Sequence, residues 1–98
     1  MDVVWLEEAK NDLLEIGRFI AKDNPETAYR TLTRISTAAD SLQSNPKLGR
    51  PGRVSGTREL IIPDLPYILP YYIKNTEVRI LAVMHTARKW PDDFSGKT

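Results

Sequence analysis

A short stretch near the C-terminus, "MHTARKWP", concentrates the side chains of this chain that are best suited to chemistry. It contains His85, Arg88, Lys89 and Trp90, and Pro91 closes it. An imidazole can transfer a proton near neutral pH, and cations can stabilise the charge of a phosphoryl transition state. Arginine and tryptophan also dominate the energetics of protein interfaces. The stretch suits proton transfer or macromolecular binding, although a histidine that ends an apolar strand is often simply a hydrogen-bonded structural residue.

A second group of cations lies in the middle of the chain. Between residues 47 and 58 the basic residues are Lys47, Arg50, Arg53 and Arg58, and no acidic residue accompanies them. Such a cluster can attract phosphates or an acidic protein surface. The segment "NPKLGRPGRVSG" is also rich in glycine and proline, so an ordinary solvated loop is the alternative interpretation.

The composition excludes several classes of protein. The 98 residues predict one domain spanning 1–98, with 92–98 as a flexible tail. No apolar run approaches the roughly 20 residues of a membrane span, and the N-terminus is not a signal peptide. We therefore expect a cytoplasmic protein that does not contact a membrane. With one histidine and no cysteine, the chain offers no metal-ligand spacing, and we expect no cofactor.

Two helices are predicted in the first half of the chain. Apolar residues recur at helical spacing over residues 7–23, at Ala9, Leu13, Ile16 and Ile20. Asn24 can cap a second helix whose first position is Pro25, and its apolar stripe runs from Ala28 to Leu42. Because almost nothing separates the two helices, they must fold back as an antiparallel hairpin.

The other segments predict strands, at residues 2–5, 57–62, 67–73 and 77–85. Short links join the last three runs, so we expect an antiparallel meander. The predicted fold class is α+β, with the order β-α-α-β-β-β. A helical hairpin packs on one face of a curved, mostly antiparallel sheet. The face that the hairpin leaves uncovered is where we expect an apolar docking surface for a partner.

Two details of the sheet follow from single residues. In the last run, alternation is expected to place four apolar side chains on one face, namely Val78, Ile80, Ala82 and Met84. Pro70 lacks a backbone donor, so we expect a bulge or an unpaired side in the middle run. The aromatic residues Trp5, Tyr67, Tyr71 and Tyr72 are expected in or beside the core, and Arg58–Glu59 and Glu77–Arg79 as cross-strand ion pairs.

Three segments, in this order, resemble the RelE/ParE superfamily of bacterial toxins, and more closely its ParE branch. They are "VVWLEEAKNDLLEI", "LGRPGRVSGTRELIIPDLPYILPYYI" and "EVRILAVMHTARKWP". The resemblance extends from Val3 to about Pro91. It implies the toxin of a type II toxin–antitoxin system, neutralised by a partner antitoxin that wraps around it. RelE-like members cut mRNA on the ribosome, whereas ParE-like members inhibit DNA gyrase.

The resemblance to the nucleases is weak at the residues that would do the chemistry. Arg58 stands where those enzymes carry paired lysines, and Ile68 where they carry a strand arginine. No tyrosine follows Tyr72, so their C-terminal tyrosine is absent. A metal-independent ribonuclease built on this chain would have to use His85, Arg58 and Arg88.

The ParE-like interpretation requires a binding surface and no catalytic group. Its target-binding residues would be Arg50, Arg53, Arg58, His85, Arg88, Lys89 and Trp90. ParE-like members commonly end in a similar way, with a histidine shortly before an arginine and Trp-Pro. We therefore favour a toxin that binds DNA gyrase and is not itself an enzyme. The alternatives are a ribosome-dependent mRNA endonuclease and an inactive member that only binds its antitoxin.

Overall fold

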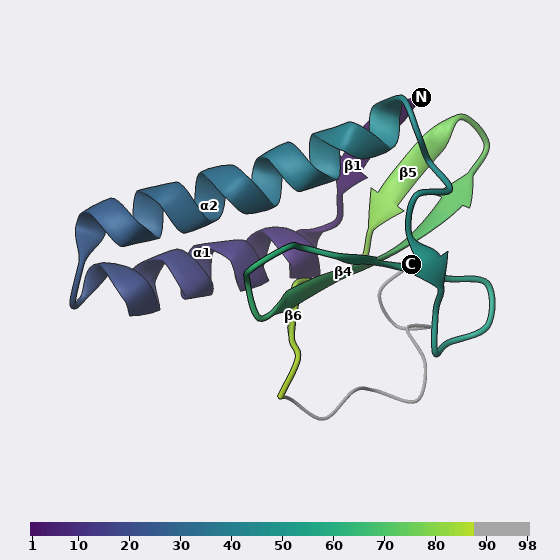
Figure 1. Cartoon of the computed structure of the whole chain (residues 1–98). Coiled ribbons are helices and arrows are strands. Elements are labelled where there is room, and N and C mark those ends of the chain that lie inside the picture. Colours follow the sequence, from purple (N-terminus) through teal and green to yellow (C-terminus); the bar gives the residue numbers. More distant parts are fainter. Residues whose placement is uncertain (88–98) are drawn as a thin grey trace.

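The computed structural model describes residues 1–87 (Figure 1). The expectations for Arg88, Lys89, Trp90 and the tail 92–98 lie outside the described residues. The elements are β1 (Asp2–Trp5), α1 (Glu7–Ala21), α2 (Pro25–Asp40), the single 3₁₀ turn η1 (Ser41–Gln43), β2 (Arg50–Pro51), β3 (Arg58–Ile61), β4 (Tyr67–Lys74), β5 (Glu77–Ile80) and β6 (Met84–His85).

The predicted helical hairpin is present. Helix α1 begins with Glu7 and Glu8, whose charges suit the positive end of the helix dipole. It ends at Ala21, slightly before the predicted Asp23. The Asn24 side chain accepts a hydrogen bond from the Thr27 amide at 3.1 Å, so the predicted cap of α2 is confirmed. The two helices lie side by side (Figure 1).

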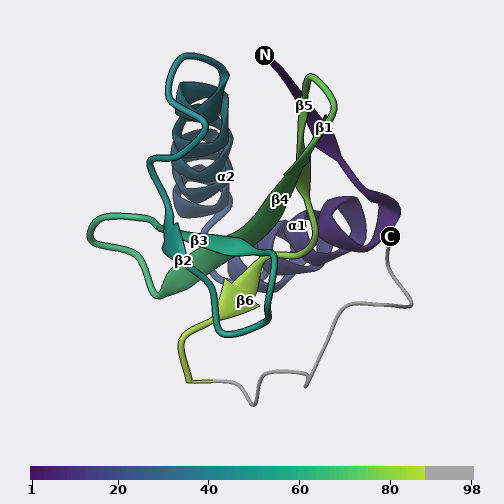
Figure 2. The same cartoon turned by 90° about the vertical axis from the view of Figure 1, so that its right-hand side faces the viewer.

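The sheet has the strand order β1-β5-β4-β3-β2, and β6 also pairs with β4. Strand β1 pairs with β5 in parallel, while the other pairs are antiparallel. The sheet is strongly twisted, so that β3 and β5 run in clearly different directions in Figure 2. The α+β class and the mostly antiparallel sheet are confirmed. Strand β2, in contrast, forms within the segment that was predicted to be a loop, because Arg50 and Pro51 pair with Glu59 and Arg58.

The main core lies between the helical hairpin and the helix-facing side of the sheet. It includes Ile35 of α2 and Leu69, Tyr71 and Ile80 of the sheet, all fully buried. The far side of the sheet carries a second, smaller cluster formed by Leu81 and Ala82 with Leu6, Val54, Tyr72 and Met84. The far side is therefore less exposed than expected, because the chain itself buries much of its apolar surface.

The last predicted strand, 77–85, is interrupted, which corrects two expectations. Ile80 lies opposite Tyr71, and Met84 lies opposite Ile68. The last run thus advances four residues while β4 advances three, so it contains one extra residue, as in a β-bulge. For the middle run we expected a bulge or an unpaired side at Pro70. The bulge is not in β4, which is continuous. The unpaired side is present, since the pairing of β4 with β5 ends at Tyr71, next to Pro70. Pro70 still accepts a hydrogen bond from the Leu81 amide at 2.9 Å, and the extra residue follows that bond.

The bulge changes which way the following side chains point. Because one inserted residue shifts the alternation by one, every later side chain moves to the other side of the sheet. Met84 therefore lies in the far-side cluster with Ala82, and the expected single face with Val78 and Ile80 is wrong for these two residues. His85 lies opposite Tyr67, on the helix-facing side.

Within residues 1–87, no helix combines the length and the hydrophobicity that crossing a lipid bilayer would require.

Candidate functional site

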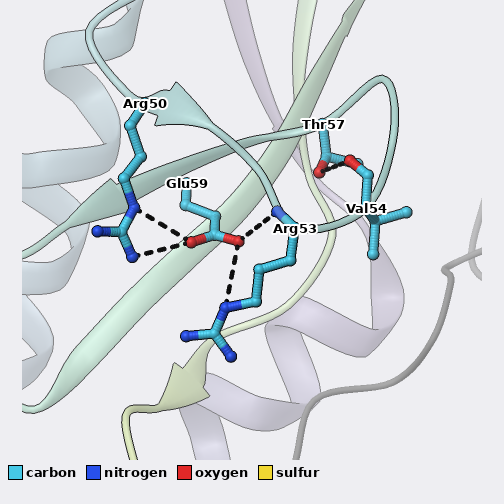
Figure 3. A network of polar contacts seen from close by, with 5 residues as sticks. All are labelled: Arg50, Arg53, Val54, Thr57 and Glu59. Carbon is cyan, nitrogen blue, oxygen red and sulfur yellow. Dashed lines mark hydrogen bonds and ion pairs between the residues drawn. The ribbon is translucent and has the colours of Figure 1, made fainter.

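A buried carboxylate organises the basic segment that the sequence singled out (Figure 3). Glu59 is only 2% exposed and lies opposite Arg50 in the β2–β3 pair. Its Oε1 accepts hydrogen bonds from Arg50 Nε at 3.3 Å and Nη2 at 3.1 Å. Its Oε2 accepts one from the Arg53 amide at 2.8 Å and lies 3.8 Å from Arg53 Nε. We call Arg50, Arg53 and Glu59 the Glu59 cluster.

The two arginines of this cluster are held in place but remain accessible. Each side chain is 51% exposed, and both guanidinium groups approach the same carboxylate. Charge-assisted bonds of this kind are stronger than neutral ones. The cluster therefore places two cations next to each other at the surface, on the far side of the sheet.

The loop that follows is also ordered by its own hydrogen bonds. The Gly52 amide donates to the Thr57 carbonyl at 2.8 Å. The Thr57 hydroxyl donates to the Val54 carbonyl at 2.6 Å (Figure 3). The side chain of Val54 packs on the far-side cluster. The Gly52–Thr57 hydrogen bond thus closes the loop that carries Arg53, and the Val54 side chain fixes this loop on the far-side cluster.

Arg58 does not join these arginines. Successive side chains of a strand point to opposite sides, so Arg58 faces the helix-facing side with its cross-strand neighbour Tyr71. Its Nη1 donates to the carbonyls of Gly49 at 2.7 Å and Lys47 at 3.3 Å. The expected Arg58–Glu59 ion pair is therefore wrong, and Arg58 supports the turn before β2.

Tyr71 also stabilises the turn before β2. Its hydroxyl donates to the Pro46 carbonyl at 2.7 Å and accepts from the Gly49 amide at 2.9 Å. Burial raises the pKa of Tyr71, against the smaller lowering effects of the Gly49 hydrogen bond and the Arg58 charge. Tyr71 and Arg58 together form a structural support for the start of the basic segment.

His85 lies in a groove between α1 and the end of the sheet. The groove has a volume of about 360 Å³ and is lined by Asp12, Glu15, Ile16, Phe19, Tyr67, Val83 and His85. The His85 ring meets the Tyr67 ring edge-on, with centroids 5.5 Å apart. Its Nδ1 accepts a hydrogen bond from the Ala87 amide at 3.0 Å, which favours the tautomer that carries the proton on Nε2.

The described members of the candidate ribonuclease set are far apart. His85 and Arg58 pair with β4 on opposite edges, at Tyr67 and Tyr71. The strand rise and the spacing between strands place their Cα atoms roughly 16 Å apart. Since the Arg58 guanidinium is directed to Gly49 and Lys47, the two side chains do not converge on a common position for a phosphate.

A further polar group on the far side was only partly foreseen. Arg79 Nε donates to Glu77 Oε1 at 2.9 Å, and its Nη1 donates to the Tyr72 hydroxyl at 3.3 Å. Both hydrogen bonds raise the pKa of Arg79, and the bond to Tyr72 has the larger effect. The predicted Glu77–Arg79 pair exists, but both residues belong to β5 and so the pair is not cross-strand. Among residues 1–87, no group of three His, Cys, Asp or Glu side chains could hold a metal ion.

Sequence reasoning missed the role of Glu59. The signal that could have indicated it is an acidic residue inside a β-favouring run, "TRELII", with a cluster of arginines just before it. A buried carboxylate requires cationic or hydrogen-bonding partners, and the preceding arginines are the nearest candidates.

The chain is similar to known toxins along most of its length. The family described as "ParE toxin of type II toxin-antitoxin system, parDE" matches residues 3–90. "Putative toxin Y4kP" of Sinorhizobium fredii is 49% identical over 87 residues, which cover 89% of this chain and 90% of that protein. "Toxin RelE2" of Caulobacter vibrioides is 38% identical over 86 residues, covering 88% and 96%. A solved structure, "Chromosomal ParDE TA system from P. aeruginosa", matches with a TM-score of 0.80 and 28% identity, covering 87% of this chain and 95% of that one.

Proposed function

The chain belongs to the ParE toxin family of type II toxin–antitoxin systems, and on this premise we propose that it inhibits DNA gyrase by binding to it. In this proposal the toxin is a single cytoplasmic domain that acts through a contact surface and breaks no bond itself. A cognate antitoxin neutralises it, by analogy with the similar P. aeruginosa structure, which is described as a ParDE system.

The observation that carries the proposal is the Glu59 cluster. Arg50 and Arg53 are both half-exposed and both tied to one buried carboxylate. Binding immobilises fewer side-chain rotamers when the contact residues are already ordered, which saves part of the entropy cost of association. Arginine is also among the residue types that contribute most to interfaces. A pre-ordered pair of this kind suits recognition of an acidic protein surface.

The positions of the other candidate residues support binding over catalysis. RNA cleavage without a metal requires a base, an acid and cations around one phosphate. Here His85 and Arg58 do not converge, and Ile68, at the position of the nucleases' strand arginine, is buried opposite Met84. The contributions of Arg88, Lys89 and Trp90 to the proposed surface stay predictions.

A ribosome-dependent mRNA endonuclease is the second candidate. Two observations favour it: a relative 38% identical to this chain is named Toxin RelE2, and His85 lines a groove large enough to hold a ligand group. In this alternative, His85 would transfer a proton through Nε2, and the cation would have to come from outside the described residues.

The two candidates are separated by one pair of assays on the same purified protein. We expect the toxin, at micromolar concentration, to inhibit DNA supercoiling by gyrase and to leave ribosome-bound mRNA intact. Cleaved mRNA together with unaffected supercoiling would reverse the assignment. Neither effect, in a folded protein that still binds its antitoxin, would identify an inactive member. Addition of the protein encoded by the neighbouring reading frame should restore supercoiling if that protein is the antitoxin.

A further inference from the structure

A hydrogen bond to a side chain of helix α1 accompanies the bulge in the last strand. The Val83 amide donates to Asp12 Oδ2 of α1 at 2.9 Å, a hydrogen bond between residues 71 positions apart in the chain. Leu81 is the last residue of the run before the bulge to bond with β4, at the Pro70 carbonyl. Pairing resumes at Met84, opposite Ile68. Leu81 and Ala82 both belong to the far-side cluster, so these two residues share the place opposite Pro70, and Val83 lies on the helix-facing side with Leu69. The Val83 amide donates to the Asp12 carboxylate and not to β4.

The hydrogen bond has a consequence for the residues that follow. A strand without the extra residue would direct Met84 to the helix-facing side and His85 to the far side. With it, Met84 joins the far-side cluster, and His85 packs edge-on against Tyr67 in the groove beside α1. The bulge therefore links the Val83–Asp12 hydrogen bond to the side of the sheet on which His85 lies.

We propose that Asp12 is a positioning residue for the C-terminal part of the toxin. By accepting the Val83 amide, its carboxylate keeps the extra residue in the strand and so keeps His85 on the helix-facing side. It thereby also sets the place and direction from which the chain continues after Ala87. The effect on target binding rests on the proposed function, while the effect on His85 does not.

Pro70 lies next to the bulge and limits the hydrogen bonds that β4 can make there. Proline has no amide hydrogen, so β4 cannot donate a hydrogen bond back to the last run at this point. The ladder is therefore weakest next to the bulge, and a hydrogen bond from a side chain of α1 can decide between two registers there. A buried backbone amide without an acceptor would be costly, which disfavours the bulged register once the carboxylate is removed.

The test uses the isotope-labelled, full-length protein and three variants. Asp12→Ala removes the acceptor, whereas Asp12→Asn keeps an oxygen that can accept the same bond. Glu15→Ala is the matched control, because Glu15 carries the same charge, lies one turn further along α1 and lines the same groove. Amide hydrogen exchange at Val83 and the NMR cross-peak between the Tyr67 and His85 rings report the position of the bulge directly.

We expect a slowly exchanging Val83 amide in the wild type, the Asn variant and the Glu15 control. In Asp12→Ala, we expect exchange at Val83 to be at least roughly tenfold faster, while core amides such as that of Val78 keep their protection. The Tyr67–His85 cross-peak should be lost in that variant and retained in the other two. Rescue by asparagine would separate the hydrogen bond from a general effect of negative charge.

Two results would overturn the proposal. One is fast exchange at Val83 in the wild type, which would mean that the bond is absent. The other is an Asp12→Ala protein with Val83 still protected and His85 still against Tyr67. If Asp12→Ala does not fold, the wild-type and Asp12→Asn measurements decide the question. Gyrase inhibition is measured in parallel and should weaken only in Asp12→Ala. A wild type that does not inhibit gyrase would refute the proposed function and leave the positioning test intact.

Discussion

Arg50 holds Glu59 through two guanidinium nitrogens, Nε at 3.3 Å and Nη2 at 3.1 Å from the same carboxylate oxygen. The partners differ in environment, since the Glu59 side chain is 2% exposed and the Arg50 side chain 51%. The carboxylate belongs to the interior and the cation to the surface. The buried Glu59 carboxylate thus fixes the position of the exposed Arg50 guanidinium group. A change at Glu59 should therefore alter both the stability of the fold and the surface that we propose binds the target.

The first prediction concerns stability at Glu59. Replacing Glu59 by alanine should lower the free energy of unfolding by about 1–3 kcal/mol, because the Arg53 amide loses its acceptor in a part-buried hydrogen bond. Urea denaturation, followed by circular dichroism, measures the difference. The control is Glu77→Ala, whose half-buried pair with Arg79 should contribute no more than about 1 kcal/mol. Equal losses of unfolding free energy in the two variants would mean that the burial of Glu59 adds nothing to the stability of the fold.

The second prediction concerns target binding. The double variant Arg50→Ala/Arg53→Ala should raise the toxin concentration for half-inhibition of gyrase by at least roughly tenfold, because arginines commonly supply much of an interface's energy. Arg18→Ala/Arg30→Ala removes the same charge from exposed positions on the two helices. The half-inhibition concentration of this control variant should stay within about threefold of the wild-type value, since charges outside an interface contribute little to affinity. A similar loss in both proteins would indicate non-specific attraction to net charge.

The third prediction concerns the hydroxyl of Tyr71. Tyr71→Phe should cost about 1–3 kcal/mol, since it removes two hydrogen bonds and leaves the Gly49 amide without its acceptor. Tyr72→Phe is the control, because that hydroxyl accepts a single bond from Arg79 near the surface. We expect its effect on the unfolding free energy to be smaller.

The same hydroxyl predicts how stability depends on pH. Burial raises the pKa of Tyr71 above its usual value of 10.0, so the folded protein retains this proton longer than the unfolded chain. The contribution is fully present below pH 10.0 and is lost as the pH rises through the folded-state pKa. The stability difference between the wild type and Tyr71→Phe should therefore shrink above pH 10.0. A difference that grows with pH would contradict the direction of the shift.

The fourth prediction concerns the close approach at Gly49. A Cβ atom there would lie 2.7 Å from the Tyr71 hydroxyl and 2.9 Å from the Glu59 carbonyl oxygen. Because the second contact is with backbone, it cannot be relieved by a rotamer change, and Gly49→Ala should cost about 1–3 kcal/mol. In the control, Gly17→Ala, the three atoms nearest to the new Cβ all belong to the flexible side chain of Leu32. A gain in helix propensity of about 1 kcal/mol offsets that contact, and thermal unfolding compares the two variants.

Local rules were sufficient for the helical part of the fold. The helical spacing of apolar residues predicted α1 and α2, and the Asn24-Pro25 start of α2 was confirmed by a hydrogen bond three residues away. Such signals operate within one turn of helix, so they can be read without tertiary information. Runs of β-branched and aromatic residues located the strands β1, β3 and β4 for the same reason.

The candidate site was only partly predictable, because its geometry depends on contacts between distant segments. Sequence pattern identified Arg50 and Arg53 as basic and exposed, but it did not indicate that Glu59 would hold them. It grouped Arg58 with them, although strand alternation turns Arg58 toward Tyr71. Adjacent residues in a sequence can lie on opposite sides of a sheet, and the strand register decides which side each one occupies.

The amino-acid sequence by itself determined the type and order of the main elements, the family resemblance, and the basic character of the segment before β3. Only the tertiary structure decided which of those basic residues lie together and on which side of the sheet His85 lies. The physical reason is that alternation along a strand is a local rule that one extra residue reverses. Here a carboxylate on α1 stabilises that extra residue through a bond to Val83, 71 positions along the chain.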